Sequence, residues 1–269
     1  MWHAETAAAV ERRGEQLVWA IRISTEFNEF SPPGDYRGYK EALAAHYDAE
    51  PRPGLTPKHP HVFVFKDKRE VDGDGVPYRT FTDYAYDVSE KFHEELGVRR
   101  PHHPPLDPVQ PHEWPAEYVC KRAYKRDAAI VEFPNRSYAV TEPLREIIEG
   151  LEPGVHQFNP IRVLLPKGVE HPIQHHMMVV GRWLNAFRLE ESDPSCLRDA
   201  DTVSPAVYID DKRSFAGVAM AASEIGSAHL WRERAFRGGT FYVSDVLKAE
   251  TERAGLRLPP TFKMKSVNL

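Results

Sequence analysis

The sequence predicts an α+β fold, mainly antiparallel sheet with flanking helices. Strand-like runs of β-branched and aromatic residues share the chain with amphipathic helical segments, and the two do not alternate as a doubly wound parallel sheet requires. The chain has 269 residues, of which 41% are hydrophobic and 11% aromatic, which is enough for a packed core. At about 150 residues per domain, this length corresponds to one large domain or two ordinary ones.

A proline-rich segment divides the chain into two parts. Arg99–Pro115 reads RRPHHPPLDPVQPHEWP, and proline lacks the N–H that a helix interior or a central strand needs. We expect an extended surface connector here. The predicted domains are therefore an N-terminal α/β part with Pro-rich loops over residues 1–115 and an α+β domain over residues 116–269.

The N-terminal part contains few regular segments between its prolines. Apolar residues at helical spacing predict a helix over Ala4–Ile23, and Tyr39–Tyr47 predicts a shorter one. His61–Phe65 is an apolar run that predicts a strand, and the Asp-Gly pairs of Val71–Val76 predict a hairpin-type turn. Asp87–Leu96 predicts a helix that ends at the following glycine.

Two weakly similar strand–cap–helix units lie in the C-terminal part. In Tyr138–Leu144 and again in Tyr242–Leu247, an apolar strand runs into Thr or Ser and then into an acidic residue. Thr141 and Ser244 are predicted N-caps, whose side-chain oxygens accept hydrogen bonds from the first N–H groups of each helix. The acidic residue that follows suits the positive end of the helix dipole, and Gly255 is expected to end the second helix.

The chain between these two units is predicted to be mainly β. Phe158–Leu165 predicts a strand, Pro166–Gly168 a turn and Met177–Phe187 a return strand. Val207–Ile209 predicts a further short strand, and Ala228–Phe236 mixes aromatic with charged residues. Strands that return through short turns favour antiparallel pairing.

Composition and charge exclude several classes of protein. The net charge of −5 and the pI near 6.2 argue against a dedicated nucleic-acid binder. The mean hydropathy is −0.53, and no stretch approaches the roughly 18 apolar residues of a membrane helix. Two cysteines cannot form a disulfide framework, and Met1–Glu5 does not read as a secretory signal. We expect a soluble cytoplasmic protein with neither a nucleic-acid nor a membrane partner.

Thirteen histidines raise the hypothesis of a metal site, for which His171, His175 and His176 are the closest group. Adjacent histidines on a strand point to opposite faces, and no HExxH helix accompanies them. We favour strand histidines without a metal, and we predict no cofactor. A metal-assisted hydrolase that uses this histidine cluster is the alternative.

The remaining motifs do not form a catalytic constellation. The sequence has no GxSxG, no Walker loop and no GxGxxG. Asp72, Asp74 and Asp83 match three positions of a calcium loop, but Pro77 stands where that loop needs glycine. Cys120 is interpreted as a buried structural cysteine. We therefore predict that the protein is not an enzyme.

Four segments of the C-terminal part are YAVTEPLREIIEGL at Tyr138–Leu151, HQFNPIRV at His156–Val163, MVVGRWLNAF at Met178–Phe187 and LWRERAFRGGTFYVSDVL at Leu230–Leu247. Together they resemble the eleventh family of bacterial polymorphic-toxin immunity proteins, over roughly residues 128–256. The family's motifs read S-E-x-L-K, x-Q-F-x-P-V and V-S-D-x-L, and Thr141 replaces the serine of the first motif.

This resemblance implies an immunity protein that binds and neutralises a cognate secreted toxin by stoichiometric occlusion. The negative net charge suits a toxin with a basic surface. Loop residues that mix tyrosine with aspartate suit an interface with hot spots and a charged rim. The candidate toxin-binding residues are Asp72, Asp74, Tyr78, Asp83, Tyr84, Tyr86 and Asp87. A non-inhibitory effector accessory protein is a further alternative.

Overall fold

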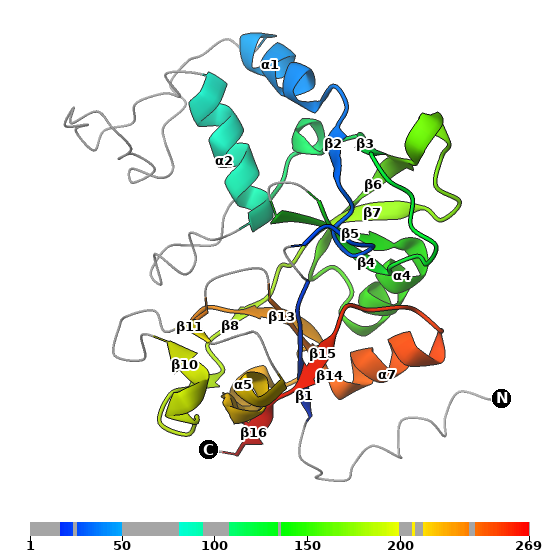
Figure 1. Ribbon diagram of the computed structural model, residues 1–269. Coiled ribbons are helices and arrows are strands. Elements are labelled where there is room, and N and C mark those ends of the chain that lie inside the picture. Colours follow the sequence, from blue (N-terminus) through cyan, green and yellow to red (C-terminus); the bar gives the residue numbers. More distant parts are fainter. Residues whose placement is uncertain are drawn as a thin grey trace, which may run out of the picture. The chain divides into compact units, whose positions relative to one another are not determined.

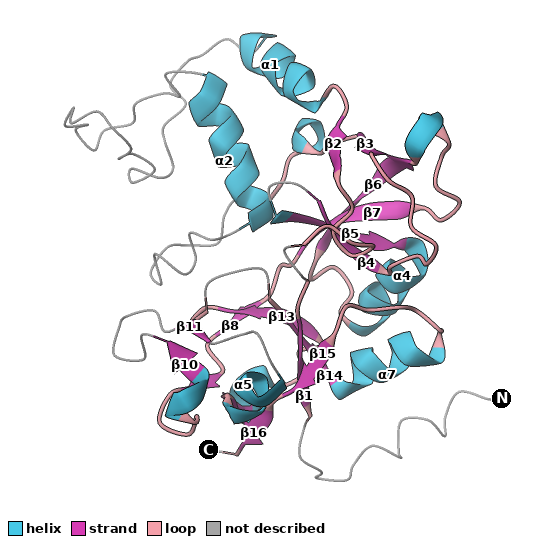
Figure 2. Ribbon diagram, in the orientation of Figure 1, coloured by secondary structure: helices cyan, strands magenta, loops and turns pink. Residues whose placement is uncertain are grey.

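The structure is a computed structural model that describes residues 17–23, 26–49, 81–93, 108–133, 136–198, 206–207, 212–236 and 240–268. The chain forms two compact units: the first unit combines Met1–Ile23, Glu146–Val155 and Val180–Leu269, and the second unit combines Ser24–Arg145 and His156–Val179. Both contain helices and sheets (Figure 2), and most of the paired strands are antiparallel. The predicted α+β fold is confirmed.

The second unit is built on one sheet. Its strands are Gly34–Tyr36 (β2), Glu117–Cys120 (β3), Ile130–Phe133 (β4), Ser137–Thr141 (β5), Gln157–Leu164 (β6) and His175–Val179 (β7). In the described residues the strand order is β2-β3-β6-β7-β5-β4, with β3 and β6 parallel and the other neighbours antiparallel. Every residue of β5 is buried, because strands lie on both sides of it and its side chains pack on both faces.

Helical segments of the second unit pack together beside this sheet (Figure 1). They are Tyr39–Ala49 (α1), Phe81–His93 (α2) and the 3₁₀ turn Pro111–Glu113 (η1). Helix α1 contacts α2 and η1, and α2 contacts β5 and β7. The helix predicted over Tyr39–Tyr47 is confirmed, whereas α2 begins earlier than the predicted start at Asp87. Turn η1 lies in the predicted extended connector and is tolerated there because Pro111 occupies the first helical position.

The first unit holds the remaining strands and most of the remaining helices. The strands are Val18–Ile21 (β1), Trp183–Leu184 (β8), Phe187–Arg188 (β9), Leu197–Arg198 (β10), Ala206–Val207 (β11), Ala219–Ala221 (β12), Leu230–Glu233 (β13), Phe241–Ser244 (β14), Thr261–Lys263 (β15) and Lys265–Val267 (β16). The helices are Lys212–Gly217 (α5), Ala222–Ile225 (α6) and Asp245–Arg253 (α7), with a 3₁₀ turn at Pro194–Cys196 (η4). Glu142–Leu151 (α4) has residues in both units, and Pro166–Gly168 (η3) is a turn of the second.

Two described sheets organise the core of the first unit. One has the order β15-β1-β14-β13-β8 and the other β16-β12-β9. Trp231 and Tyr242 face each other with ring centroids 6.1 Å apart, and Phe215 and Met220 are fully buried in the same cluster. Among the described residues no helix has both the length and the apolar composition that crossing a membrane requires.

The helix predicted over Ala4–Ile23 is wrong at its described end. Val18–Ile21 forms strand β1, and Val18 pairs with Ser244 of β14. Tertiary pairing overrides the helical spacing because Val, Trp and Ile are also strong strand formers. The return strand predicted over Met177–Phe187 is interrupted after Val179, where the chain leaves the sheet of the second unit.

Two further predictions concern elements of the N-terminal part and its division from the C-terminal part. The strand predicted at His61–Phe65 and the turn at Val71–Val76 lie outside the described residues. Strand β1 pairs with β14 and β2 pairs with β3, so main-chain hydrogen bonds join residues 1–115 to residues 116–269. The division at residue 115 does not follow the two units, and as a division into independently folding domains it stays a prediction.

Both predicted strand–helix successions are confirmed, but of the two predicted caps the structure shows the one at Ser244. Ser244 Oγ accepts a hydrogen bond from the Leu247 N–H at 3.1 Å. Thr141 Oγ1 is buried and has no hydrogen-bond partner in the described part of the chain. The cap at Thr141 is therefore wrong, because Pro143 removes one of the N–H donors that a cap could bind.

This difference predicts that two matched substitutions affect the free energy of unfolding differently. Ser244→Ala removes a cap and should lower the free energy of unfolding by about 1 kcal/mol. Thr141→Val replaces an unpaired buried hydroxyl with a methyl group and should leave this free energy unchanged or raise it. Urea unfolding followed by circular dichroism measures both. An equal loss in the two variants would contradict the assignment.

Candidate functional site

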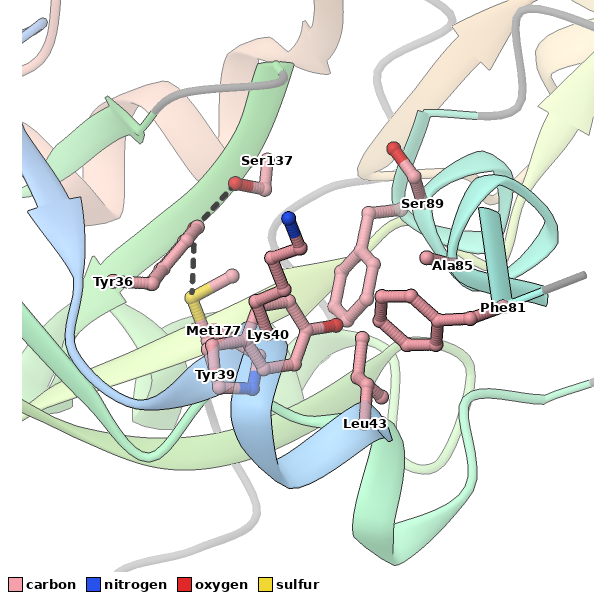
Figure 3. Close-up of a pocket in the computed structure, with 11 residues that line it drawn as sticks. Tyr36, Tyr39, Lys40, Leu43, Phe81, Ala85, Ser89, Ser137 and Met177 are labelled. Carbon is pink, nitrogen blue, oxygen red and sulfur yellow. Dashed lines mark hydrogen bonds between the residues drawn. The ribbon is translucent and has the colours of Figure 1, made fainter. Parts of the chain in front are cut away.

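A cavity of ≈ 220 Å³ lies in the second unit. One wall comes from α1, with Tyr39, Lys40 and Leu43, and the opposite wall comes from α2. The remaining lining residues are Tyr36 of β2, Ser137 of β5, Met177 of β7 and Pro115, which lies just before β3. Figure 3 shows the labelled side chains of this lining around one space.

Helix α2 contributes one face to this cavity. Phe81, Ala85, Ser89 and Phe92 are spaced by four, four and three residues, which places them on one side of a helix. Val88, three residues after Ala85 and four before Phe92, lies beside this face and is buried. The sequence prediction missed the face because alanine and serine interrupt its apolar pattern and because the helix was expected to begin only at Asp87.

The sheet side of the cavity carries a pair of hydroxyl groups. The Tyr36 and Ser137 hydroxyls lie 2.5 Å apart, and the Tyr36 hydroxyl donates to Met177 Sδ at 3.9 Å (Figure 3). Burial raises the pKa of Tyr36 far above its ordinary value. This side of the cavity is therefore polar but uncharged.

Glu113 fixes the walls relative to one another. The Tyr39 hydroxyl of α1 donates to its carbonyl oxygen at 2.6 Å, and Lys91 Nζ of α2 donates to both carboxylate oxygens, at 2.5 and 2.6 Å. The Gln110 N–H donates to the same carboxylate at 2.7 Å. One buried residue of η1 thus connects the two helices that line the cavity.

Lys40 is the cationic group of the lining. It is exposed on α1. Its nitrogen is directed toward the region between Ser137 and Ser89 (Figure 3). Within the described ranges its ammonium group makes no hydrogen bond or ion pair, in contrast to Lys91. The cavity therefore combines apolar walls with a cation that has no partner among the described residues.

Four of the seven predicted toxin-binding residues lie on α2. Asp72, Asp74 and Tyr78 lie outside the described residues, and Asp83 and Asp87 lie on α2. The ring of Tyr84 is buried 5.7 Å from that of Tyr47, and its hydroxyl is hydrogen-bonded to His112 Nε2 at 3.1 Å. Tyr86 is 47% exposed. Of the two tyrosines on α2, Tyr86 is the one that presents a ring to solvent.

Two of the three histidines of the metal hypothesis, His171 and His175, lie with ring centroids 4.7 Å apart and share the Ile173 carbonyl oxygen as a partner of Nδ1. His171 Nε2 lies 3.1 Å from Asp127 Oδ1, and His176 Nδ1 lies 3.1 Å from Glu142 Oε2. His175 is buried, its Nδ1 is 2.9 Å from the Ile173 carbonyl oxygen, and burial lowers its pKa to about 4. In the described residues no group of three or more His, Cys, Asp or Glu side chains could hold a metal ion.

The first unit contains a second cluster of ionisable groups. Glu233 of β13 is buried, and its carboxylate accepts a hydrogen bond from the Ala186 N–H at 2.8 Å. Burial raises the pKa of Glu233 to about 7, although main-chain N–H groups partly oppose the shift. The adjacent Arg232 lies over the Trp183 and Phe241 rings, 5.6 and 4.8 Å from their centroids. These contacts place the cluster in the core of the first unit.

The ion pair between Glu113 and Lys91 predicts that substitutions of these two residues are strongly coupled. Glu113→Gln leaves the half-buried Lys91 ammonium without its carboxylate, and Lys91→Met leaves the buried carboxylate without its cation. Each single substitution should lower the free energy of unfolding by about 3 kcal/mol, since breaking a buried ion pair leaves an uncompensated charge. The double variant should lose clearly less than the sum. A double-mutant cycle in urea measures this, and additive losses would contradict the coupling.

Glu233 predicts a pH dependence of stability. A carboxyl group whose pKa is raised from 4.5 to about 7 binds its proton more tightly in the folded protein. Its contribution to stability is therefore complete below pH 4.5 and is lost as the pH rises through 7. Between about pH 5 and pH 8 the free energy of unfolding of the wild type should fall by about 2–3 kcal/mol more than that of Glu233→Gln. Parallel pH profiles for the two proteins would contradict this.

Comparison with known proteins identifies the family. No curated protein matches the chain. The model of the immunity protein family (Imm11) matches residues 58–259, which include β3 to β14 and helix α2 with its face of the cavity. This match is longer than the resemblance over residues 128–256 and covers more than half of the chain. The chain therefore belongs to the immunity protein family (Imm11).

Proposed function

We propose that this protein binds a cognate bacterial toxin and neutralises it by stoichiometric occlusion, without turnover. Membership of an immunity protein family supports an immunity function. The observation that carries the proposal is the α1–α2 surface of the second unit, which combines a preformed cavity with an exposed tyrosine. We name this surface, formed by Tyr39–Ala49 and Phe81–His93, the α1–α2 surface.

The α1–α2 surface has the properties of a binding surface with hot spots. Tyr86 offers a large ring with few rotatable bonds, and tyrosine is enriched among residues that dominate binding energy. Hydrogen bonds from Tyr39 of α1 and Lys91 of α2 to Glu113 hold the two helices in place. Little conformational entropy is therefore lost when a partner binds. Asp72, Asp74, Tyr78, Asp83 and Asp87 stay predicted contacts, since they lie on α2 or in the chain that leads to it.

Charge and location are part of the same proposal. With a net charge of −5, the protein would attract a toxin with a basic surface and so accelerate association. An immunity protein of this kind acts in the cytoplasm of the cell that produces the toxin. Immunity also predicts a toxin gene beside the gene of this protein.

Co-expression tests the proposal directly. Cells that express the toxin encoded by the neighbouring gene should survive when they also express this protein, and the purified proteins should form a complex of fixed stoichiometry. A complex without rescue would favour the accessory-protein alternative. Neither complex nor rescue would overturn the proposal.

Two exposed aromatic residues of the second unit give a matched test of the surface. Tyr86 is 47% exposed on α2, whereas Phe27 is 71% exposed in the segment before β2. Tyr86→Ala should weaken toxin binding by about tenfold or more, which is the effect of a moderate hot spot. Phe27→Ala should change the Kd by less than about twofold. Isothermal titration calorimetry measures both, and equal effects would place the interface elsewhere.

A further inference from the structure

We propose that the cavity of the second unit receives an aromatic side chain of the toxin, and that the Lys40 ammonium group binds a carboxylate next to that ring. This inference rests on the proposed function, because it names the chemistry that the α1–α2 surface recognises. It also defines a site that a small molecule can probe without the toxin.

The size of the cavity favours one ring. Its volume is ≈ 220 Å³. A dry cavity of about 150 Å³ holds benzene, and sites for drug-sized ligands begin at about 300 Å³. The cavity is therefore large enough for one aromatic side chain and too small for a nucleotide or a folded peptide.

The walls favour an apolar, flat group. Leu43, Phe81 and Phe92 supply aliphatic and aromatic surface. The Tyr36 hydroxyl is held by Ser137 and stays uncharged, so this side does not require an ionic partner. An aromatic side chain that leaves water for this space gains burial of most of its apolar surface.

Lys40 adds a charge requirement to the site. Its nitrogen has no carboxylate within the part of the chain that the structure describes, although it lines the same cavity as the aromatic walls. An anionic group beside the inserted ring would pair with this ammonium, whereas an arginine or lysine there would be repelled. A carboxylate of Asp or Glu in the toxin segment meets this requirement.

The site is preorganised rather than formed on binding. Tyr39 and Lys91 are both held by Glu113, so the walls from α1 and α2 keep their separation in the free protein. A preformed cavity avoids the ordering cost that weakens many interfaces. This property makes weak binding of a small ring compound measurable.

The first experiment uses 3-phenylpropanoate as the probe, which carries one ring and one carboxylate, and 3-phenylpropanamide as its neutral match. Titration followed by NMR chemical shifts of the full chain should show binding of the carboxylate with a Kd near about 1 mM, as expected for a ligand of this size. The amide should bind about three- to fivefold more weakly, which is the value of a partly exposed ion pair. Absence of binding by the carboxylate overturns the proposal.

Variants then test the two parts of the site. Lys40→Met should weaken the probe about three- to fivefold, and Lys121→Met, at an exposed lysine of the same unit, should not change its Kd. Ala85→Phe fills the cavity and should abolish binding, with circular dichroism confirming the fold. If this variant fails to fold, Ser89→Met makes the same test. Unchanged binding in Lys40→Met overturns the charge requirement, and unchanged binding in the filled variant overturns the cavity.

Toxin rescue separates this inference from the proposed function. If the wild type protects and Ala85→Phe and Lys40→Met protect less, the anchor is supported. If all three protect equally, the anchor is overturned and the immunity function stands. If the wild type itself fails to protect although it binds the probe, the immunity function is overturned and the toxin anchor with it, while the cavity keeps its ligand chemistry.

Discussion

The buried carboxylate of Glu113 is the constraint on which the architecture of the α1–α2 surface depends. It accepts hydrogen bonds from Lys91 and from the Gln110 main chain, and the carbonyl oxygen of the same residue accepts one from Tyr39. Two helices separated by more than thirty residues of sequence therefore meet at one short turn. Burying an ion pair does not by itself stabilise a fold, because desolvation offsets the attraction. Glu113 instead restricts the position of α1 relative to α2, because displacing either helix would separate the Tyr39 hydroxyl or the Lys91 ammonium from Glu113.

That geometry explains why the cavity stays open. Side chains normally collapse into empty space unless the elements that carry them are fixed. Here α1 is held through Tyr39 and α2 through Lys91, while Phe92 packs edge-on against Trp114 with ring centroids 5.3 Å apart. The small residues Ala85 and Ser89 then leave a space between the helices that larger residues would fill. The cavity is thus a consequence of rigid supports combined with small residues on one helix face.

Local sequence signals predicted the second half of the chain better than the first. Strand β5 with α4, and β14 with α7, were predictable because an apolar strand followed by a polar residue and an amphipathic helix is specified within about fifteen residues. The assignment of Val18–Ile21 failed because its strand conformation comes from pairing with β14, more than two hundred residues away. The cavity was also beyond prediction, since the amine of Lys40, the ring of Phe92 and the hydroxyl of Ser137 come from three distant segments. Among the side chains that the structure describes, Tyr86 combines a sequence-based expectation with observed exposure on the α1–α2 surface.

In the proposed complex, the negative net charge and Lys40 would act at different stages of recognition. A charge of −5 spread over the protein acts at long range, is screened within about 10 Å at moderate salt, and therefore affects the rate of association with a basic toxin. In that complex Lys40 would act only after contact, when its ammonium group and the partner's carboxylate leave bulk water beside the inserted ring. A toxin that is basic as a whole but carries one acidic group beside an exposed aromatic residue satisfies both requirements. The long-range field would then set the speed of encounter, and the cavity would decide which encounter becomes a stable complex.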